Sequence, residues 1–314
     1  MVKFKIKLVI GLIVVTILTF IITTKLSKLS QLPVVGIVNW GPHATLQAVI
    51  DGVKAELTNQ AQFKILDVNF DQTLIIQALH QLQATKPAVI ITMGTPITQA
   101  AKKLIKDIPV VFAAVTDPNE VGLGSEAGIS DRQDLKNFLA FAKKLIPSLN
   151  KIGLLYSTSE ANDLALVKMM KQAADLHGMN VVAVPVEHAR DIPLRMRLLN
   201  GQVDLLYVGV SGTIQPSLPA IVAEADRMKI PVFNVSEEAV FKHHVVGSFG
   251  LNYYKLGQRL AGIVKNILLN KQFNKLKKPV YPKVSDFYGV VSKKKAQYFN
   301  IIIPDDLHNI KVID

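Results

Sequence analysis

Short apolar runs alternate with amphipathic stretches from residue 34 onwards. Runs of four to eight apolar residues are typical of strands in a buried parallel sheet, and apolar residues three or four positions apart are typical of helices that cover it. The pattern predicts strands at 34–38, 63–70, 88–93 and 109–115, separated by helices at 43–60, 72–85 and 96–106. Strand–helix units of this length indicate an α/β fold with helices on both faces of the sheet.

The alternation then starts again, which predicts a second α/β domain in tandem with the first. Strands are expected at 151–156, 180–186, 203–210 and 231–235, with helices at 161–177, 190–200 and 215–228. An apolar segment at 245–252 and a long helix at 253–270 follow. The pattern alone allows these two segments to extend the second sheet or to return to the first domain.

The N-terminal thirty residues have a different character. Seventeen residues without charge, LVIGLIVVTILTFIITT, lie between Lys7 and Lys25 and would reach about 26 Å as a helix, enough for a bilayer core. A cleaved signal peptide is the alternative, but no small-x-small cleavage site follows the run. We therefore expect residues 1–30 to be an uncleaved anchor with a short tether, and the body of the chain to lie outside the cytoplasm.

Charge and cysteine content narrow the function classes. The formal net charge is +12, but five of the lysines flank the apolar run and a second group lies between 271 and 295. No helix-turn-helix, zinc-finger or aromatic–basic pattern accompanies them, so nucleic acid is not an expected partner. The absence of cysteine excludes disulfides, thiolate metal sites and cysteine nucleophiles.

No pattern of catalytic or phosphate-binding residues stands out. The sequence lacks G-x-S-x-G, H-E-x-x-H, Walker A and G-x-G-x-x-G, and the glycine-rich segment 122–128 is interpreted as a turn. We therefore expect a protein that is not an enzyme and that uses no cofactor or metal.

The ends of the predicted strands are the expected site. In open parallel sheets ligands bind beyond the carboxyl ends of the strands, so two facing domains would enclose a cleft. The candidate segments are residues 39–40, 93–96, 116–118, 156–160, 210–213 and 235–237.

Several of these segments resemble one known family. The motifs PVVFAAVTDP (109–118), LLYSTSEAND (154–163), VDLLYV (203–208), IPVF (230–233) and FGLNYYKLG (249–257) occur in the order seen in ABC-transporter substrate-binding proteins for aromatic amino acids. The resemblance covers about 34–304. It implies the type I periplasmic binding protein fold, with a first lobe at 34–130 plus about 247–278 and a second lobe at 131–246 plus about 279–314.

The resemblance also implies ligand-binding positions. His43 corresponds to the family's histidine of the first lobe, and Thr95, Thr116 and Asp117 correspond to its T-P and T-D-P strand ends. Tyr156, Ser157, Glu160 and Asn162 correspond to its Y-N-S-G-E-A-N segment. Trp40 is a candidate apolar wall, and Asp117 is the first candidate for the partner of a ligand ammonium.

Three positions depart from the family pattern. Ser211, Ser236 and Asn252 stand at or beside places where the family usually has an aspartate, and we keep these three in the candidate site. A buried ammonium needs a charged partner. These neutral residues therefore leave open a less cationic ligand than an amino acid, or a degraded site.

The expected function is that of a monomeric, extracytoplasmic solute-binding protein anchored to the inner membrane. It would trap a small molecule, with an aromatic or apolar amino acid as the leading class, and pass it to ABC permease subunits. The alternative is a membrane-anchored sensory module on the same fold, with an altered ligand.

Overall fold

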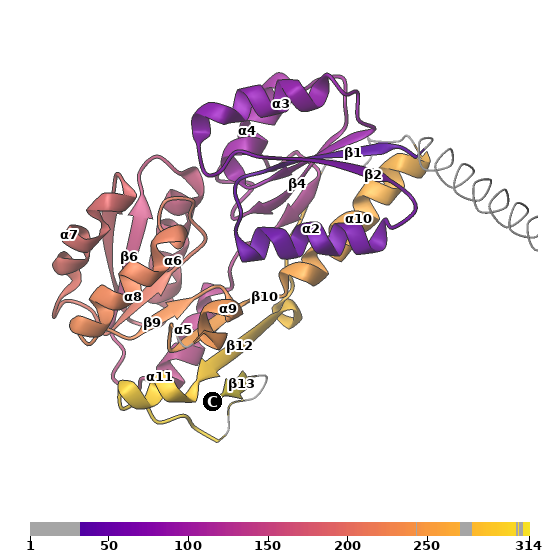
Figure 1. Ribbon diagram of the computed structural model, residues 1–314. Coiled ribbons are helices and arrows are strands. Elements are labelled where there is room, and N and C mark those ends of the chain that lie inside the picture. The colour runs from indigo at the N-terminus through magenta and orange to yellow at the C-terminus, as the bar shows by residue number, and fades with distance from the viewer. Residues whose placement is uncertain (1–31, 243, 271–277, 306, 308–309) are drawn as a thin grey trace, which may run out of the picture.

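The computed structural model describes residues 32–242, 244–270, 278–305, 307 and 310–314, which form two α/β lobes (Figure 1). Within these ranges no helix is both long enough and apolar enough to cross a bilayer. The predicted anchor at 8–24 lies outside the described residues.

The first lobe contains a six-stranded sheet with the order β11-β5-β4-β3-β1-β2, in which all neighbours are parallel. Its strands are β1 (Val34–Asn39), β2 (Gln62–Asp67), β3 (Val89–Met93), β4 (Val110–Val115), β5 (Gly128–Ser130) and β11 (Pro279–Val280). Its helices are α2 (Ala44–Glu56), α3 (Ile75–Gln83), α4 (Thr95–Leu104) and α10 (Tyr253–Asn270). Helices α3 and α4 cover one face of the sheet, and α2 and α10 cover the other (Figure 1).

The second lobe contains a seven-stranded sheet with the order β13-β12-β10-β9-β8-β6-β7. Its strands are β6 (Lys151–Ser157), β7 (Asn180–Val186), β8 (Leu205–Val208), β9 (Val232–Asn234), β10 (Gly247–Leu251), β12 (Phe287–Ser292) and β13 (Ile310–Ile313). Its helices are α5 (Leu135–Leu145), α6 (Ala161–Leu176), α7 (Ile192–Met196), α8 (Leu218–Arg227), α9 (Glu237–Phe241) and α11 (Lys293–Tyr298). Only the β10–β12 pair is antiparallel among the described strand pairs of this sheet. One core joins α5 and α6 to the sheet, and a second joins α7 and α8 to its other face.

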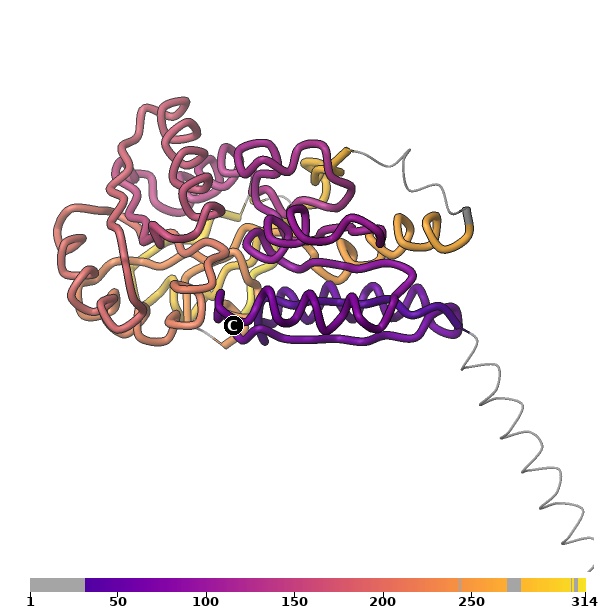
Figure 2. The backbone as a smooth tube through the Cα atoms, turned by 90° about the horizontal axis from the view of Figure 1, so that it is seen from above, coloured from indigo at the N-terminus to yellow at the C-terminus, as the bar shows by residue number. Residues whose placement is uncertain are grey.

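Between the described elements the chain crosses from one lobe to the other three times. The first crossing follows β5, the second lies between β10 and α10, and the third lies between β11 and β12. Strand β10 pairs with β12 as far as Leu251↔Phe287, so the second crossing comes at about 252 and not at 247 as expected. Helix α10 consequently lies among the N-terminal segments of the first lobe, although it follows most of the second lobe in the chain (Figure 2).

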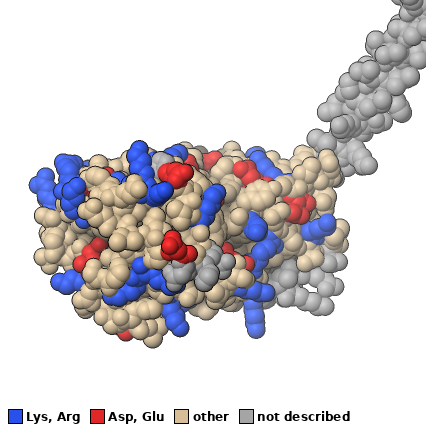
Figure 3. All heavy atoms as spheres, turned by 90° about the horizontal axis from the view of Figure 1, so that it is seen from below, with Lys and Arg blue, Asp and Glu red and all other residues tan. Residues whose placement is uncertain are grey.

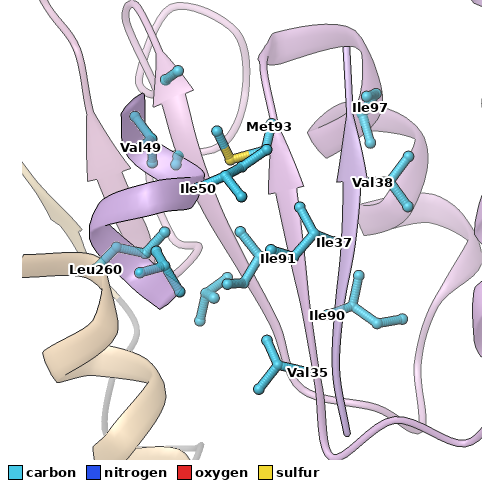
Figure 4. Close-up of a cluster of buried hydrophobic side chains, with 14 of the residues drawn as sticks. Val35, Ile37, Val38, Val49, Ile50, Ile90, Ile91, Met93, Ile97 and Leu260 are labelled. Atoms are coloured by element: carbon cyan, nitrogen blue, oxygen red, sulfur yellow. The ribbon is translucent and has the colours of Figure 1, made fainter. Parts of the chain in front are cut away.

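Strand alternation organises the core of the first lobe (Figure 4). Val35 and Ile37 on β1 point to the face covered by α2 and α10, whereas Val38 points to Ile97 of α4. All four side chains are fully buried, so both faces of this central strand are apolar. That burial explains why β1 reads as a continuous apolar run in the sequence.

Two glycines allow α2 and α10 to approach each other closely. A Cβ atom on Gly257 would lie 2.1 Å from the carbonyl oxygen of Val49, and one on Gly52 would lie 2.2 Å from that of Tyr254. These distances are far inside van der Waals contact and the opposing atoms are backbone. The crossing of the two helices therefore requires glycine at both positions.

Candidate functional site

The carboxyl ends of the central strands of both sheets enclose a cavity of about 50 Å³ between the lobes. Its walls come from loops after β1, β2, β3 and β4 of the first lobe, from the crossing after β5, and from loops after β6 and β8 of the second. The lining residues are Trp40, His43, Thr45, Leu46, Phe70, Gly94, Thr95, Pro96, Ala114, Thr116, Asp131, Glu160, Asn162, Val210, Ser211, Gly212 and Gln215.

An aromatic pair forms the apolar wall on the first lobe. Trp40 follows β1 and is 6% exposed, and its ring meets that of Phe70 edge to face with centroids 6.2 Å apart. The backbone N–H of Phe70 donates to the carbonyl oxygen of Trp40 at 2.7 Å. Gly41 makes room for the Phe70 ring, which would lie 2.6 Å from a Cβ at that position. Backbone and side-chain contacts thus fix both rings.

The N-terminus of α4 presents polar groups to the cavity. Gly94 adopts the left-handed φ of 95° at the N-cap, and Thr95 begins the helix. The first turn of a helix leaves its backbone N–H groups without intrahelical acceptors and carries partial positive charge. The Thr95 hydroxyl is buried and has no hydrogen-bond partner among the described residues. This helix end is suited to an anionic group such as a carboxylate.

Asp131 brings a carboxylate to the cavity from the first crossing. Its Oδ2 accepts a hydrogen bond from the Tyr253 hydroxyl at 3.3 Å, whereas Oδ1 is buried and unpaired within the described chain. Burial raises the pKa of Asp131 to about 6, although the hydrogen bond from Tyr253 acts in the opposite direction. An ammonium beside Oδ1 would supply the missing partner.

Glu160 lines the cavity, but backbone and side-chain donors of the second lobe occupy its carboxylate. Oε1 accepts from the backbone N–H and the hydroxyl of Thr213, at 2.8 and 2.7 Å, and Oε2 accepts from the N–H of Gly212 at 2.9 Å. These bonds hold the loop after β8 in place. Glu160 therefore shapes the second-lobe wall.

Two neighbours of Glu160 complete this wall. Asp163 accepts from the Ser157 N–H at 2.7 Å and from the Ser211 hydroxyl at 2.8 Å, and burial together with the nearby Glu160 carboxylate raises the pKa of Asp163. The side-chain amide of Asn162 donates to the carbonyl oxygen of Val210 at 3.1 Å. Its Oδ1 is buried without a partner in the described ranges and is the free acceptor of this wall.

The cavity brings together seven of the twelve residues predicted from the sequence. These are Trp40, His43, Thr95, Thr116, Glu160, Asn162 and Ser211. His43 is held by its contact with Thr45, whose N–H lies 3.4 Å from its Nδ1, and burial lowers the pKa of this histidine.

Asp117 does not line the cavity, and this corrects its expected role as the ammonium partner. Its carboxylate forms an ion pair with the Arg132 guanidinium and accepts from the backbone N–H groups of Asn119 and Glu120 at 3.2 and 3.4 Å. These bonds turn the carboxylate back into its own loop and leave it with a cationic partner. Asp131 takes its place at the cavity.

The remaining four predicted residues lie elsewhere. Tyr156 packs at the edge of the second lobe's core, and the Ser157 hydroxyl pairs with that of Ser159 at 3.0 Å. Ser236 and Asn252 line a separate groove between the lobes, beside α9 and the start of α10. The Asn252 side chain accepts from the Lys255 N–H at 3.0 Å, which places it at the start of α10.

Asp131 was not predicted from the sequence because the strand before it is only three residues long. Such a strand has no periodicity, and its first residue was assigned to a turn. The strand-end rule would have found Asp131 if GIS at 128–130 had been recognised as a strand. The same rule could have identified Phe70, which stands at the end of the predicted strand 63–70.

Within the part of the chain that the structure describes, no three His, Asp or Glu residues are grouped to hold a metal ion.

Comparison with protein families gives a match over nearly the whole body. The sequence model of the family described as ABC transporter substrate binding protein matches residues 34–311. The curated relatives include a tyrosine-binding protein of Clostridioides difficile, which is 32% identical over 194 residues. That alignment covers 59% of this chain and 56% of the relative, little more than half of its length.

Solved structures share the architecture. A conserved domain protein of Vibrio cholerae is 25% identical with a TM-score of 0.81, and the match covers 90% of this chain and 99% of that one. An ABC domain of Streptococcus pneumoniae in complex with L-Trp is 23% identical with a TM-score of 0.83, covering 90% and 100% of the two chains. These likenesses show a periplasmic binding protein fold of two lobes built on parallel sheets.

Proposed function

The chain belongs to the family of ABC transporter substrate-binding proteins, and from this premise we propose that it traps an α-amino acid in the cleft between its lobes. The proposed ligand class is the apolar and aromatic amino acids, which the protein would pass to ABC permease subunits. Binding requires no covalent step, because closure of the lobes removes water and orders polar groups around the ligand.

Four buried polar atoms carry the proposal. Trp40 Nε1, Thr95 Oγ1, Asp131 Oδ1 and Asn162 Oδ1 have no hydrogen-bond partner among the described residues, and all four residues line the cavity. A buried polar group without a partner costs about 1–3 kcal/mol. The Asp131 and Asn162 oxygens suit an ammonium, and the Trp40 and Thr95 donors suit a carboxylate. An amino acid zwitterion supplies both groups.

The relatives support the same ligand class. One relative is named for binding tyrosine, and one structure of the same fold holds L-Trp. The aromatic wall of Trp40 and Phe70 provides this chain with an apolar surface at the cavity.

The proposed location is outside the cytoplasm, with residues 8–24 as an anchor in the inner membrane. The carboxyl ends of the first lobe's strands face the cleft, so β1 begins at the far end of that lobe (Figure 1). An anchor preceding β1 would therefore leave the cleft free for ligand and permease. On the face shown in Figure 3, basic and acidic residues are interspersed and do not form a continuous basic stripe of the kind that binds nucleic acid.

Thermal shift with amino acids, sugars and purines tests the ligand class. A ligand at a hundred times its Kd adds about 2.7 kcal/mol of stability, which raises the melting temperature measurably. We expect apolar and aromatic L-amino acids to stabilise the protein, and sugars and purines to leave its melting temperature unchanged. Asp131→Asn should abolish the amino acid shift. A shift with sugars or purines alone would contradict the proposal.

A further inference from the structure

A buried tyrosine of the first lobe is bonded to the carboxylate of Asp131. Tyr253 is the first residue of α10 and Asp131 is the first residue after β5, so each lies at the first-lobe end of a crossing. The Tyr253 hydroxyl donates to Asp131 Oδ2 at 3.3 Å, and the two residues are 5% and 1% exposed. This hydrogen bond therefore joins the first crossing to the second in the interior of the protein.

A glutamine sets the direction of the hydrogen bond. The side-chain Nε2 of Gln133 donates to the backbone carbonyl oxygen of Asp131 at 2.6 Å. A carbonyl oxygen only accepts, so this contact fixes which end of the amide is the nitrogen. The same Nε2 lies 3.5 Å from the Tyr253 hydroxyl oxygen. The hydroxyl thus accepts from Gln133, and its one proton is directed to Asp131.

The Tyr253 hydroxyl keeps its proton at neutral pH. Burial and the nearby Asp131 charge raise the pKa of Tyr253 above its ordinary value. The hydroxyl is therefore a permanent donor, and it uses only Oδ2 of Asp131. The other oxygen, Oδ1, is buried without a partner among the described residues and belongs to a residue that lines the cavity.

We propose that Tyr253 is a positioning residue for ligand binding: its hydroxyl holds Oδ2 of Asp131, so that the carboxylate stays ionised and presents Oδ1 to the ammonium of the bound amino acid. This inference rests on the proposed amino acid function and adds a residue that acts through Asp131. It concerns the ammonium that all α-amino acids share, so it applies to apolar and aromatic ligands alike.

Loss of the hydroxyl would change the ionisation of Asp131. Burial raises the pKa of Asp131 to about 6, and the hydrogen bond from Tyr253 is the largest influence in the opposite direction. In Tyr253→Phe this pKa should rise by about one pH unit, the effect of one hydrogen bond to a charged group. Because the ammonium needs an ionised partner, ligand affinity should begin to fall at a higher pH in the variant than in the parent chain.

Other titratable groups surround Asp131. Tyr207 of β8 faces it from the second lobe, where burial and then the Asp131 charge raise the pKa of Tyr207. Further titratable groups belong to the cavity lining or to the first crossing and its partner: His43, Glu160, Arg132 and Asp117. The parent chain and Tyr253→Phe share all of these groups. A difference between their pH profiles therefore isolates the Tyr253 hydroxyl.

Calorimetric titration of the whole chain with L-phenylalanine, L-tryptophan and L-leucine between pH 5 and pH 8 tests the proposal. At pH 6 Asp131 is about half ionised in the parent chain and about one-tenth ionised in Tyr253→Phe, so the variant should bind about fivefold more weakly. At pH 8 the carboxylate is ionised in both proteins. Their Kd values should then agree within about twofold.

An adjacent tyrosine provides the matched control. Tyr254 is the next residue of α10 and is 42% exposed, so Tyr254→Phe should bind as the parent chain does at every pH. A measurement without ligand guards against a general defect in Tyr253→Phe. Its melting temperature should fall more between pH 5 and pH 8 than that of the parent chain, because a carboxyl with a higher pKa in the folded state loses more stability when it ionises.

Four results would overturn the inference. If Tyr253→Phe has the parent's pH profile of binding, its hydroxyl has no role at the site, and a loss of equal size at every pH would show that Tyr253 acts through packing alone. An equal fall of the two melting temperatures would show that the hydroxyl does not influence the ionisation of Asp131. In these three cases the amino acid function stands. If none of the three amino acids binds to the parent chain, the proposed function fails and the inference fails with it.

Discussion

Asp131 is a buried carboxyl group whose ionisation opposes folding until a cation reaches it. Its pKa is about 6 in the folded protein against 3.8 ordinarily, so the folded state holds the proton more tightly. Stability then falls as the pH rises from about 4 to about 6, by up to about 3 kcal/mol. A ligand ammonium would offset this loss, which explains why an unfavourable group can persist at the site.

Asp131→Asn should therefore stabilise the ligand-free protein at pH 7.5 by as much as about 3 kcal/mol, and should change it little at pH 4. Urea unfolding at the two pH values measures the difference. An equal effect at both values would show that ionisation is not the cause.

Asp117 is expected to behave in the opposite way. It is 2% exposed and paired with Arg132, so Asp117→Ala leaves a partly buried guanidinium without its partner. Removing one member of a buried pair costs about 3–5 kcal/mol, and the half-exposed Arg132 reduces this to about 2 kcal/mol. Urea unfolding should show the loss, while the ligand Kd stays within about threefold. Loss of ligand binding in Asp117→Ala would instead indicate that Asp117 belongs to the binding site.

At the scale of elements, the α2–α10 crossing depends on glycine. Gly257→Ala places a methyl against the carbonyl oxygen of Val49 and should destabilise the protein by about 1–3 kcal/mol. Gly262→Ala lies on the same helix with no atom within 4 Å, and should stabilise it by about 0.5–1 kcal/mol through helix propensity. The melting temperatures of the two variants should shift in opposite directions. Equal shifts would show that the close approach of α2 and α10 does not cause the destabilisation of Gly257→Ala.

The long elements were predictable from the sequence, and the short ones were not. Strands such as 34–38 and 151–156 are buried on both faces and stand out as apolar runs. Strands β5 and β11, with three and two residues, are defined by their neighbours in the sheet and have no signal of their own. Asp131 follows β5, so it was missed for the same reason.

Side-chain direction was also beyond the sequence. The strand-end rule identified the segment of Thr116 and Asp117, but only Thr116 faces the cavity. The direction of the Asp117 side chain depends on a tertiary contact, because Arg132 reaches its carboxylate from the first crossing. The return of α10 to the first lobe was predicted only from the family resemblance, because no local sequence pattern could show it.

At the scale of the whole molecule, an ion pair links the lobes at the surface. Lys168 of α6 contacts Glu120, in the loop after β4, with both oxygens at 2.8 Å. Because both side chains are about half exposed, the pair contributes about 0.2–1 kcal/mol. Lys168→Ala should raise the ligand Kd about two- to fourfold at low salt and less at high salt.

Calorimetry at two salt concentrations measures this effect, and Lys171→Ala on the same helix is the control. Since the chain has no cysteine, a pair of introduced cysteines, one in each lobe, can carry dyes that report closure directly. A Kd change of equal size at high salt would argue against an electrostatic contact.

The three crossings also impose an order on folding. Val49 and Val53 of α2 are buried in one core with Leu256 and Leu260 of α10, and residues 131–252 separate β5 from that helix. As the chain is synthesised, the first lobe keeps this apolar face uncovered until nearly all of the second lobe has emerged. Contacts so distant in sequence form late. The N-terminal lobe, although made first, can be completed only near the end.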